Sequence, residues 1–98
     1  MTLPLLVRRE ARADIIDAYQ WYEQRSVGLG REFIRTLRAR FASVSREPQR
    51  FPIVVDDIRR APLSRFPYFI YFVDAPAAVV VIGVLHGRRN PERWQGRR

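Results

Sequence analysis

The chain of 98 residues contains no cysteine, no lysine and a single histidine, His86. Without cysteine it can form neither a disulfide nor a thiolate metal site, and its composition fits a reducing compartment. No window approaches the roughly 18 apolar residues that a membrane helix needs, and the N-terminal residues do not follow the order of a secretory signal peptide. We therefore expect a cytoplasmic protein that has no contact with a membrane.

The absence of lysine means that all 18 basic residues are arginine, against 10 acidic residues, so the formal net charge is +8. Clustered arginines raise the local concentration of anions, and this excess indicates an acidic partner, either a nucleic acid or an acidic protein segment. A genome rich in arginine codons explains the same excess if the charge is dispersed for solubility. The positions of the arginines decide between these interpretations.

The length of the chain limits its organisation. We expect one domain over residues 1–98, because the chain leaves no room for a second hydrophobic core. Hydrophobic residues make up 47% of the sequence and charged residues 29%, which is the composition of a globular domain.

A short strand and a helix are predicted at the start of the chain. Residues 3–8 have strand character, and Pro4 favours the edge of a sheet because proline cannot donate a hydrogen bond to a neighbouring strand. Asp14 and Asp17 lie near the start of the following helix, where the positive end of the helix dipole favours carboxylates. Apolar residues recur at steps of four, three and four, which predicts one apolar stripe along that helix: Ala11, Ile15, Ala18 and Tyr22.

A second helix is predicted after a glycine-containing turn. Gly28 and Gly30 release the backbone for a tight connection, and the helix ends before Pro48, since the residue before a proline is disfavoured in helical conformation. We expect the two helices to form a hairpin that covers a sheet. The inner side of the second helix carries Leu29, Phe33, Leu37, Phe41 and Val44, and its outer side carries Arg31, Arg35, Arg38 and Arg46.

The second half of the chain has strand composition. Pro52 and Pro62 bracket one short, irregular strand, and residues 66–73 form a dense aromatic and β-branched run. Residues 78–85 are too rich in valine to be half exposed, so we expect them inside the sheet. The order predicts an α+β fold with an N-terminal strand, a helical hairpin and then a three-stranded, mostly antiparallel sheet, with the helices on one face.

The chemistry that the sequence permits is narrow. One histidine without cysteine has no metal-binding spacing, and no glycine-rich phosphate loop or nucleophile elbow is present, so we expect no cofactor and no metal. A metal-free ribonuclease remains open, because it needs proton carriers and cations for the phosphorane. No catalytic set is firm. The candidate proton carriers are His86 and, by position only, Asp56 or Asp57. The arginines that could stabilise charge are Arg59, Arg60, Arg65, Arg88 and Arg89, of which Arg65 and Arg89 are the catalytic candidates.

The same residues have simpler interpretations. A histidine at a strand end is more often a structural hydrogen-bonding group than a proton carrier. Arg59 and Arg60 beside two aspartates predict exposed ion pairs that are worth little. The first helix also carries three aromatic residues, Tyr19, Trp21 and Tyr22. They favour a place in the core or in a groove for a partner over a stacking platform for nucleic acid. The candidates for target or partner binding are Arg59, Arg60, Arg65, His86, Arg88, Arg89 and Trp94.

Several motifs carry a resemblance to a known family. They are the order of elements, the aromatic strand Phe66-Pro67-Tyr68-Phe69-Ile70-Tyr71, and the ending Val84-Leu85-His86-Gly87-Arg88-Arg89-Asn90-Pro91. From about Val7 to Trp94 the chain resembles the RelE/ParE superfamily of type II toxins, and more closely its ParE (plasmid stabilization) branch. The turn Gly28-Leu29-Gly30-Arg31-Glu32-Phe33 resembles the inter-helix turn of that branch.

The two branches imply different activities. RelE-type toxins are ribosome-dependent messenger-RNA endonucleases, whereas ParE-type toxins inhibit DNA gyrase and do not cut RNA. The nucleases carry an arginine on the third strand, where this sequence has Tyr68 or Phe69. A tyrosine lacks the permanent charge with which arginine stabilises a phosphorane. The resemblance therefore favours a gyrase inhibitor over an enzyme, with a RelE-like nuclease or a degenerate toxin that only binds its antitoxin as the alternatives.

The resemblance also implies partners. An antitoxin encoded by an adjacent gene neutralises such a toxin by wrapping it with a helix and an extended segment. The target is DNA gyrase, or the ribosome and messenger RNA in the alternative, and operator DNA is bound only through the antitoxin complex.

Overall fold

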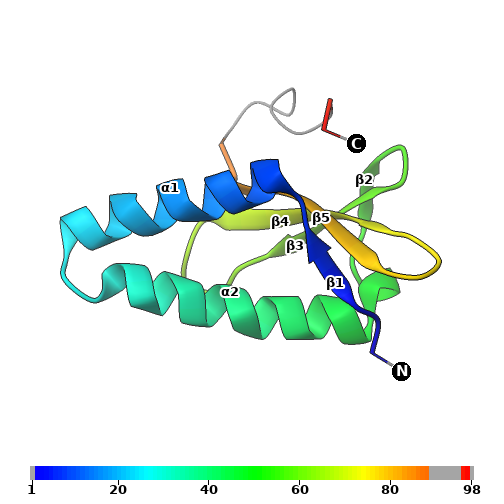
Figure 1. Ribbon diagram of the computed structural model, residues 1–98, viewed down its shortest axis with the longest axis horizontal. Helices are drawn as coiled ribbons and strands as arrows, with labels where there is room; N and C mark the ends of the chain where they lie inside the picture. Colours follow the sequence, from blue (N-terminus) through cyan, green and yellow to red (C-terminus); the bar gives the residue numbers. More distant parts are fainter. Residues whose placement is uncertain (1, 89–95, 98) are drawn as a thin grey trace.

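Two helices that run side by side cover one face of a five-stranded sheet in the computed structural model (Figure 1). The structure describes residues 2–88, 96 and 97. The α+β prediction, with a helical hairpin on one face of the sheet, is confirmed. The elements in chain order are β1 (Leu5–Val7), α1 (Arg9–Arg25), α2 (Leu29–Arg46), the 3₁₀ turn η1 (Pro48–Arg50), β2 (Ile53–Val55), β3 (Ile58–Pro62), β4 (Tyr68–Asp74) and β5 (Val79–His86).

The strand order in the sheet is β1-β5-β4-β3-β2. The prediction of a three-stranded sheet is wrong, because the segment between Pro52 and Pro62 folds back on itself and supplies two strands. Its two-residue turn begins at Asp56, whose φ of 49° lies in the left-handed region that aspartate tolerates better than most residues. The fifth strand is β1, which pairs parallel to β5 at one edge of the sheet, whereas the other neighbouring strands pair antiparallel.

An irregularity in β5 decides which of its side chains face the helices. Tyr71 of β4 pairs with Gly83, and Phe72 pairs with Val81, so Ile82 is an extra residue in the ladder. Such a bulge shifts the alternation of side chains by one position. Before the bulge, Val81 packs in the core under the helices and Ile82 on the opposite face. After it the alternation is shifted, so that Val84 packs in the core and Leu85 on the opposite face.

The sheet is apolar on both faces. The helix-covered face forms the main core, in which the rings of Tyr22, Phe33 and Phe66 pack against one another with centroids 4.9–5.5 Å apart. The helix-free face has a smaller buried cluster of Ile58, Tyr71, Ile82 and Leu85. Strand register continues this cluster into one apolar row across all five strands, formed by Leu6, Val80, Val73, Ile58 and Val55.

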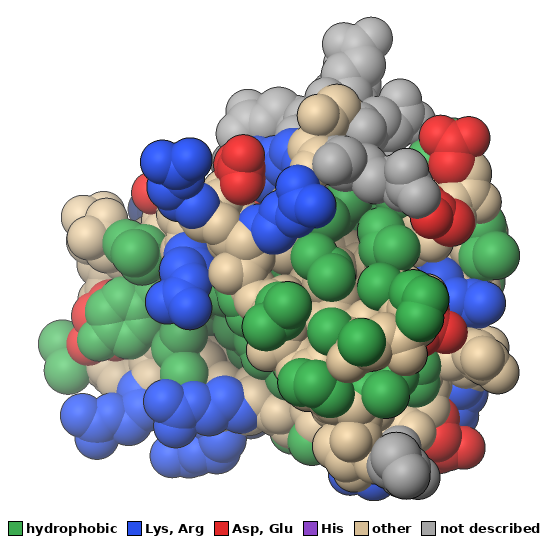
Figure 2. Space-filling model, turned by 45° about the vertical axis from the view of Figure 1, so that its right-hand side comes forward, with side chains coloured by type: hydrophobic (Ala, Val, Ile, Leu, Met, Phe, Trp, Pro, Cys, Tyr) green, Lys and Arg blue, Asp and Glu red, His purple; other side chains and the backbone are tan. Residues whose placement is uncertain are grey.

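The helix-free face is open to solvent along much of this row. Leu6 is 55% exposed, and Val55, Val73 and Val80 are half-buried. Figure 2 shows hydrophobic side chains gathered in a patch on the side of the molecule that carries the sheet, with charged side chains at its border. A patch of this kind on a small protein commonly marks a contact surface for another protein.

The two glycines at the turn between α1 and α2 have different roles. Gly28 has a φ of 91°, a conformation that costs glycine little. Gly30 is helical, and a Cβ there would lie 2.9 Å from ring atoms of Tyr19 and from its backbone oxygen. The Glu23 carboxylate accepts hydrogen bonds of 2.9 Å from the backbone N–H groups of both glycines. The turn is therefore held by a carboxylate at the start of α2, where the helix dipole also favours it.

Neither described helix is long and apolar enough to cross a membrane.

Candidate functional site

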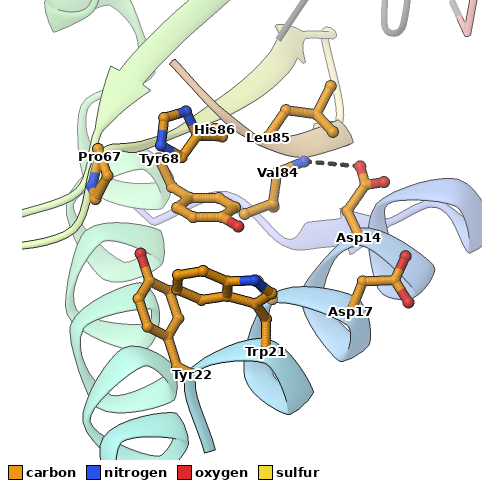
Figure 3. Close-up of a pocket in the computed structure, with 10 residues that line it drawn as sticks. Asp14, Asp17, Trp21, Tyr22, Pro67, Tyr68, Val84, Leu85 and His86 are labelled. Atoms are coloured by element: carbon orange, nitrogen blue, oxygen red, sulfur yellow. Dashed lines mark hydrogen bonds between the residues drawn. The ribbon is translucent and has the colours of Figure 1, made fainter. Parts of the chain in front are cut away.

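A cavity of about 470 Å³ lies between α1 and the ends of β4 and β5 (Figure 3). We call it the α1 pocket. Trp21 of α1 and Tyr68 of β4 lie on opposite sides of the pocket, and His86 borders it at the end of β5. Its lining is Asp14, Asp17, Ala18, Trp21, Tyr22, Pro67, Tyr68, Val84, Leu85 and His86.

Asp14 is a buried carboxylate at the inner end of the pocket, with 8% of its side chain exposed. Its Oδ2 accepts a 3.0 Å hydrogen bond from the backbone N–H of Val84, drawn as a dashed line in Figure 3. The Arg97 guanidinium donates to both carboxylate oxygens, at 2.5 Å and 3.3 Å. The β5 bulge places Gly83 beside this pair, where a Cβ would lie 3.2 Å from Arg97 Nη1. A buried carboxylate of this kind needs its partners, because desolvation without them is costly.

The sequence pattern predicted a different environment for Asp14. It indicated only a carboxylate near the start of the helix, favoured by the dipole. The structure places Asp14 in the second turn of α1, on the same face as Ala11 and Ala18. Its spacing of three and four residues from two apolar positions was the signal for burial, but its partner Arg97 lies 83 positions away and has no local signature.

His86 is half-buried and held by local contacts. Its Nδ1 accepts a 3.1 Å hydrogen bond from the backbone N–H of Arg88, and its ring lies edge-on to Tyr68 with centroids 5.4 Å apart. An acceptor at Nδ1 leaves the proton of the neutral ring on Nε2. These contacts leave Nε2 of His86 without a hydrogen bond among the described residues.

The aromatic side of the pocket combines a buried tyrosine with an exposed indole. Tyr22 packs in the core, and burial, followed by the influence of the neighbouring Tyr68, raises the pKa of its hydroxyl above 10.0. Trp21 is 49% exposed, and the Arg25 guanidinium lies 4.3 Å from the centroid of its ring. Sequence reasoning foresaw Tyr22 as a core residue, but it did not foresee that Trp21 would line a pocket with Asp14 and His86.

The two adjacent arginines of β3 point to opposite faces of the sheet, as alternation on a strand requires. Arg59 donates hydrogen bonds to the backbone oxygens of Phe51, at 2.6 Å, and Gln49, at 3.4 Å, on the helix-covered side. Arg60 lies over the ring of Phe69 at 4.3 Å on the helix-free side. Neither arginine lines the α1 pocket.

The other predicted site residues are also dispersed. Arg65 lies in the β3–β4 loop with a φ of 71°, and it forms a 2.9 Å ion pair with Glu32 of α2. Arg88 follows β5 and is exposed. Arg89 and Trp94 lie outside the described residues. The structure therefore brings His86 together with acidic and aromatic residues, and it does not gather Arg59, Arg60 and Arg65 around it.

The chemistry of the α1 pocket follows from its lining. Its charged side chains are the carboxylates of Asp14 and Asp17, and no arginine is among the described residues that line it. Arg97 balances the charge of Asp14, whereas Asp17 has no ion pair among the described residues. The charge of Asp17 therefore disfavours a phosphate in the pocket and favours a cation. Within residues 2–88, 96 and 97, no group of three or more histidine and carboxylate side chains is arranged to hold a metal ion.

Comparisons with known proteins bear on the whole chain. A solved structure described as the chromosomal ParDE TA system from P. aeruginosa superimposes with a TM-score of 0.75 at 17% sequence identity, over 87% of this chain and 96% of that chain. No curated protein matches the sequence. The family model for the ParE toxin of the type II toxin-antitoxin system, parDE, matches residues 5–91. The chain therefore belongs to the family of ParE toxins of type II toxin–antitoxin systems.

Proposed function

We propose that this ParE toxin acts in the cytoplasm by binding and inhibiting DNA gyrase, without cutting RNA, and that an antitoxin encoded by an adjacent gene neutralises it. Membership of the ParE family is the reason for proposing DNA gyrase as the target. The proposal that the toxin does not cut RNA rests on the charged groups around His86, the single histidine of the chain.

The surroundings of His86 argue against phosphodiester cleavage. A ribonuclease without metal needs cations close to the phosphorane and two proton carriers in reach of it. Asp17 lines the same pocket as His86 and disfavours a phosphate there, whereas the charge of Asp14 is already balanced by Arg97. Arg59 and Arg65, two candidates for charge stabilisation, donate instead to backbone oxygens and to Glu32. These contacts support inhibition by binding.

The helix-free face supports the antitoxin part of the proposal. Its row of Leu6, Val80, Val73, Ile58 and Val55 crosses all five strands and is partly open to solvent. An apolar segment of the antitoxin on this row would remove it from water, and binding would stabilise the toxin by mass action. The excess of arginine would attract acidic residues at the border of such a segment and raise the association rate. The complex, rather than the toxin alone, would bind operator DNA.

A gyrase assay tests the mode of action. We expect the purified chain to inhibit supercoiling or to stabilise the gyrase–DNA cleavage complex, and induction in cells to raise the DNA-damage response before translation stops. His86→Ala should retain most of this inhibition. Cleavage of messenger RNA on ribosomes that depends on His86 would overturn the proposal in favour of a RelE-like nuclease.

A second experiment tests the antitoxin. The protein of the adjacent reading frame should co-purify with this chain and restore growth when the two are co-expressed. Leu6→Asp and Val80→Asp introduce carboxylates into the apolar row and should weaken the complex by at least about tenfold. Glu10→Gln, which removes an exposed carboxylate from α1, is a comparison for general effects of surface charge. A toxic chain whose neighbour does not bind would contradict the antitoxin part alone.

A further inference from the structure

Two side chains that line the α1 pocket, Asp14 and Trp21, already contact guanidinium groups of the same chain. At the inner end, Arg97 donates to both oxygens of Asp14. On the outer side, the guanidinium of Arg25 lies 4.3 Å from the ring centroid of Trp21. These are the two arrangements by which proteins recognise arginine, a paired carboxylate and an aromatic face.

A third group of the pocket that can bind a cation, the carboxylate of Asp17, has no charged partner among the described residues. Asp17 is exposed and lies one helical turn from both Asp14 and Trp21 on α1. It forms no ion pair within the described part of the chain. Figure 3 shows its carboxylate at the same end of the pocket as that of Asp14, with the indole of Trp21 beside it. The pocket thus offers a carboxylate and an aromatic wall to a cation that residues 2–88, 96 and 97 do not supply.

We propose that the α1 pocket receives a basic side chain of the antitoxin, an arginine above all, between Trp21 and Tyr68 and beside Asp17. This inference rests on the proposed function for the identity of the partner. The local charge favours this occupant, because the carboxylate of Asp17 has no ion pair among the described residues of a chain whose net charge is +8. The antitoxin would then present one basic residue at the pocket, in contrast to the acidic residues that suit the arginine-rich surface.

The size and lining of the pocket fit this occupant. A volume of about 470 Å³ holds an arginine together with a neighbouring apolar group. Pro67, Leu85 and Ala18 supply apolar contacts for the methylene part of the side chain. A nucleotide would bring a phosphate close to the carboxylate of Asp17, which disfavours nucleic acid as the occupant.

A probe experiment tests the chemistry of the pocket without the antitoxin. The Trp94→Phe variant leaves Trp21 as the only indole of the chain, and its indole N–H resonance is followed by NMR. N-acetylarginine amide should shift the resonance saturably, whereas the uncharged citrulline analogue should not. Asp17→Asn should weaken binding about three- to tenfold, and Glu10→Gln, an exposed acid on the same helix, should leave it unchanged.

The other outcomes of the probe experiment overturn the inference. An equal response to the citrulline analogue would mean that only apolar contacts matter. Unchanged binding to Asp17→Asn would remove the carboxylate from the site. Saturable binding of guanosine monophosphate in place of the arginine probe would make the pocket a nucleotide site.

Calorimetry with the antitoxin separates this inference from the proposed function. Asp17→Asn and Trp21→Leu should each lower the affinity of the antitoxin about three- to tenfold, and Glu10→Gln should not. A complex of unchanged affinity with both pocket variants would overturn only the inference. The absence of any complex with the unmodified chain would overturn the proposed function and, with it, the identity of the partner.

Discussion

Asp14 and Arg97, 83 positions apart in the sequence, form an ion pair in which the guanidinium donates at 2.5 Å and 3.3 Å to the two carboxylate oxygens. The side chains are 8% and 17% exposed. The Asp14 carboxylate also accepts from the Val84 backbone, and the guanidinium of Arg8 donates to the Arg97 backbone oxygen at 3.1 Å. The pair thus joins α1, β5 and the C-terminal end of the chain at the inner wall of the α1 pocket.

Removal of this carboxylate should destabilise the protein. Asp14→Ala leaves the Arg97 guanidinium largely buried without its counter-charge and the Val84 N–H without an acceptor, so we expect a loss of about 3 kcal/mol in the free energy of unfolding. Urea unfolding measures it. Asp17→Asn, on the exposed side of the same helix, should stay within about 0.5 kcal/mol of the unmodified chain. A loss below about 1 kcal/mol for Asp14→Ala would contradict a structural role for the pair.

The contact between the helices at Gly30 predicts a second effect. In Gly30→Ala the new methyl group would meet Tyr19, including its backbone oxygen, at 2.9 Å. Because a backbone atom cannot rotate away, we expect a net loss of about 1–3 kcal/mol even though alanine favours the helix by about 1 kcal/mol. Gly96→Ala, where nothing lies within 4 Å, is the control. If thermal unfolding showed Gly30→Ala to be stabilised, the helices would not pack as closely as described.

The turn between α1 and α2 should depend on the carboxylate of Glu23. Glu23→Ala removes the acceptor for the N–H groups of Gly28 and Gly30, and we expect a loss of about 1–2 kcal/mol. Glu23→Gln keeps one oxygen and should lose about half as much. The adjacent, exposed Gln24→Ala serves as the comparison. Equal stability of the glutamine and alanine variants would mean that a single oxygen contributes nothing.

Burial of Tyr22 predicts a dependence of stability on alkaline pH. The pKa of its hydroxyl is raised above 10.0 in the folded chain, so the unfolded chain loses the proton first as the pH rises. The free energy of unfolding should therefore fall from about pH 10 upward. Tyr22→Phe lacks the ionisable group and should decline less steeply in urea unfolding between about pH 9 and 11. Identical slopes would show that the Tyr22 hydroxyl titrates alike in both states.

Variants of Arg59 and Arg88 should distinguish an arginine that stabilises the fold from one that binds the target. Arg59 donates to Phe51 and Gln49 ahead of β2, and Arg59→Ala should lose about 1–2 kcal/mol of stability. Arg88 is exposed, and Arg88→Ala should unfold like the unmodified chain but inhibit growth less if it contacts the target. Growth curves and urea unfolding on the same variants distinguish the two roles. Unchanged toxicity of a stable Arg88→Ala would remove Arg88 from the binding surface.

The helices were predictable because their signals are local. The stripe from Ala11 to Tyr22 and the one from Leu29 to Val44 each repeat within a few residues, and both face the core in the structure. Pro48 marks the end of α2 by its own covalent geometry. The position of β1 at the sheet edge, indicated by Pro4, is confirmed for the same reason.

The sheet was predicted less well because its strands depend on pairing. Residues 53–62 contain no glycine, and the left-handed backbone at Asp56 that splits them into β2 and β3 has no strong local signature. The bulge at Ile82 likewise arises from the register between β4 and β5. A uniform run of valines specifies that both faces are apolar, but not which residue faces the helices.

By itself, the sequence determined the α+β class, the helical hairpin and the apolar character of the last two strands, because these follow from patterns within ten to twenty residues. Only the tertiary structure decided that Asp14 is buried against Arg97 and that Trp21, Tyr68 and His86 line one pocket. The physical reason is distance along the chain. An ion pair or a cavity wall that joins residues from opposite ends leaves no periodicity in either segment, and it exists only once the helices lie on the sheet.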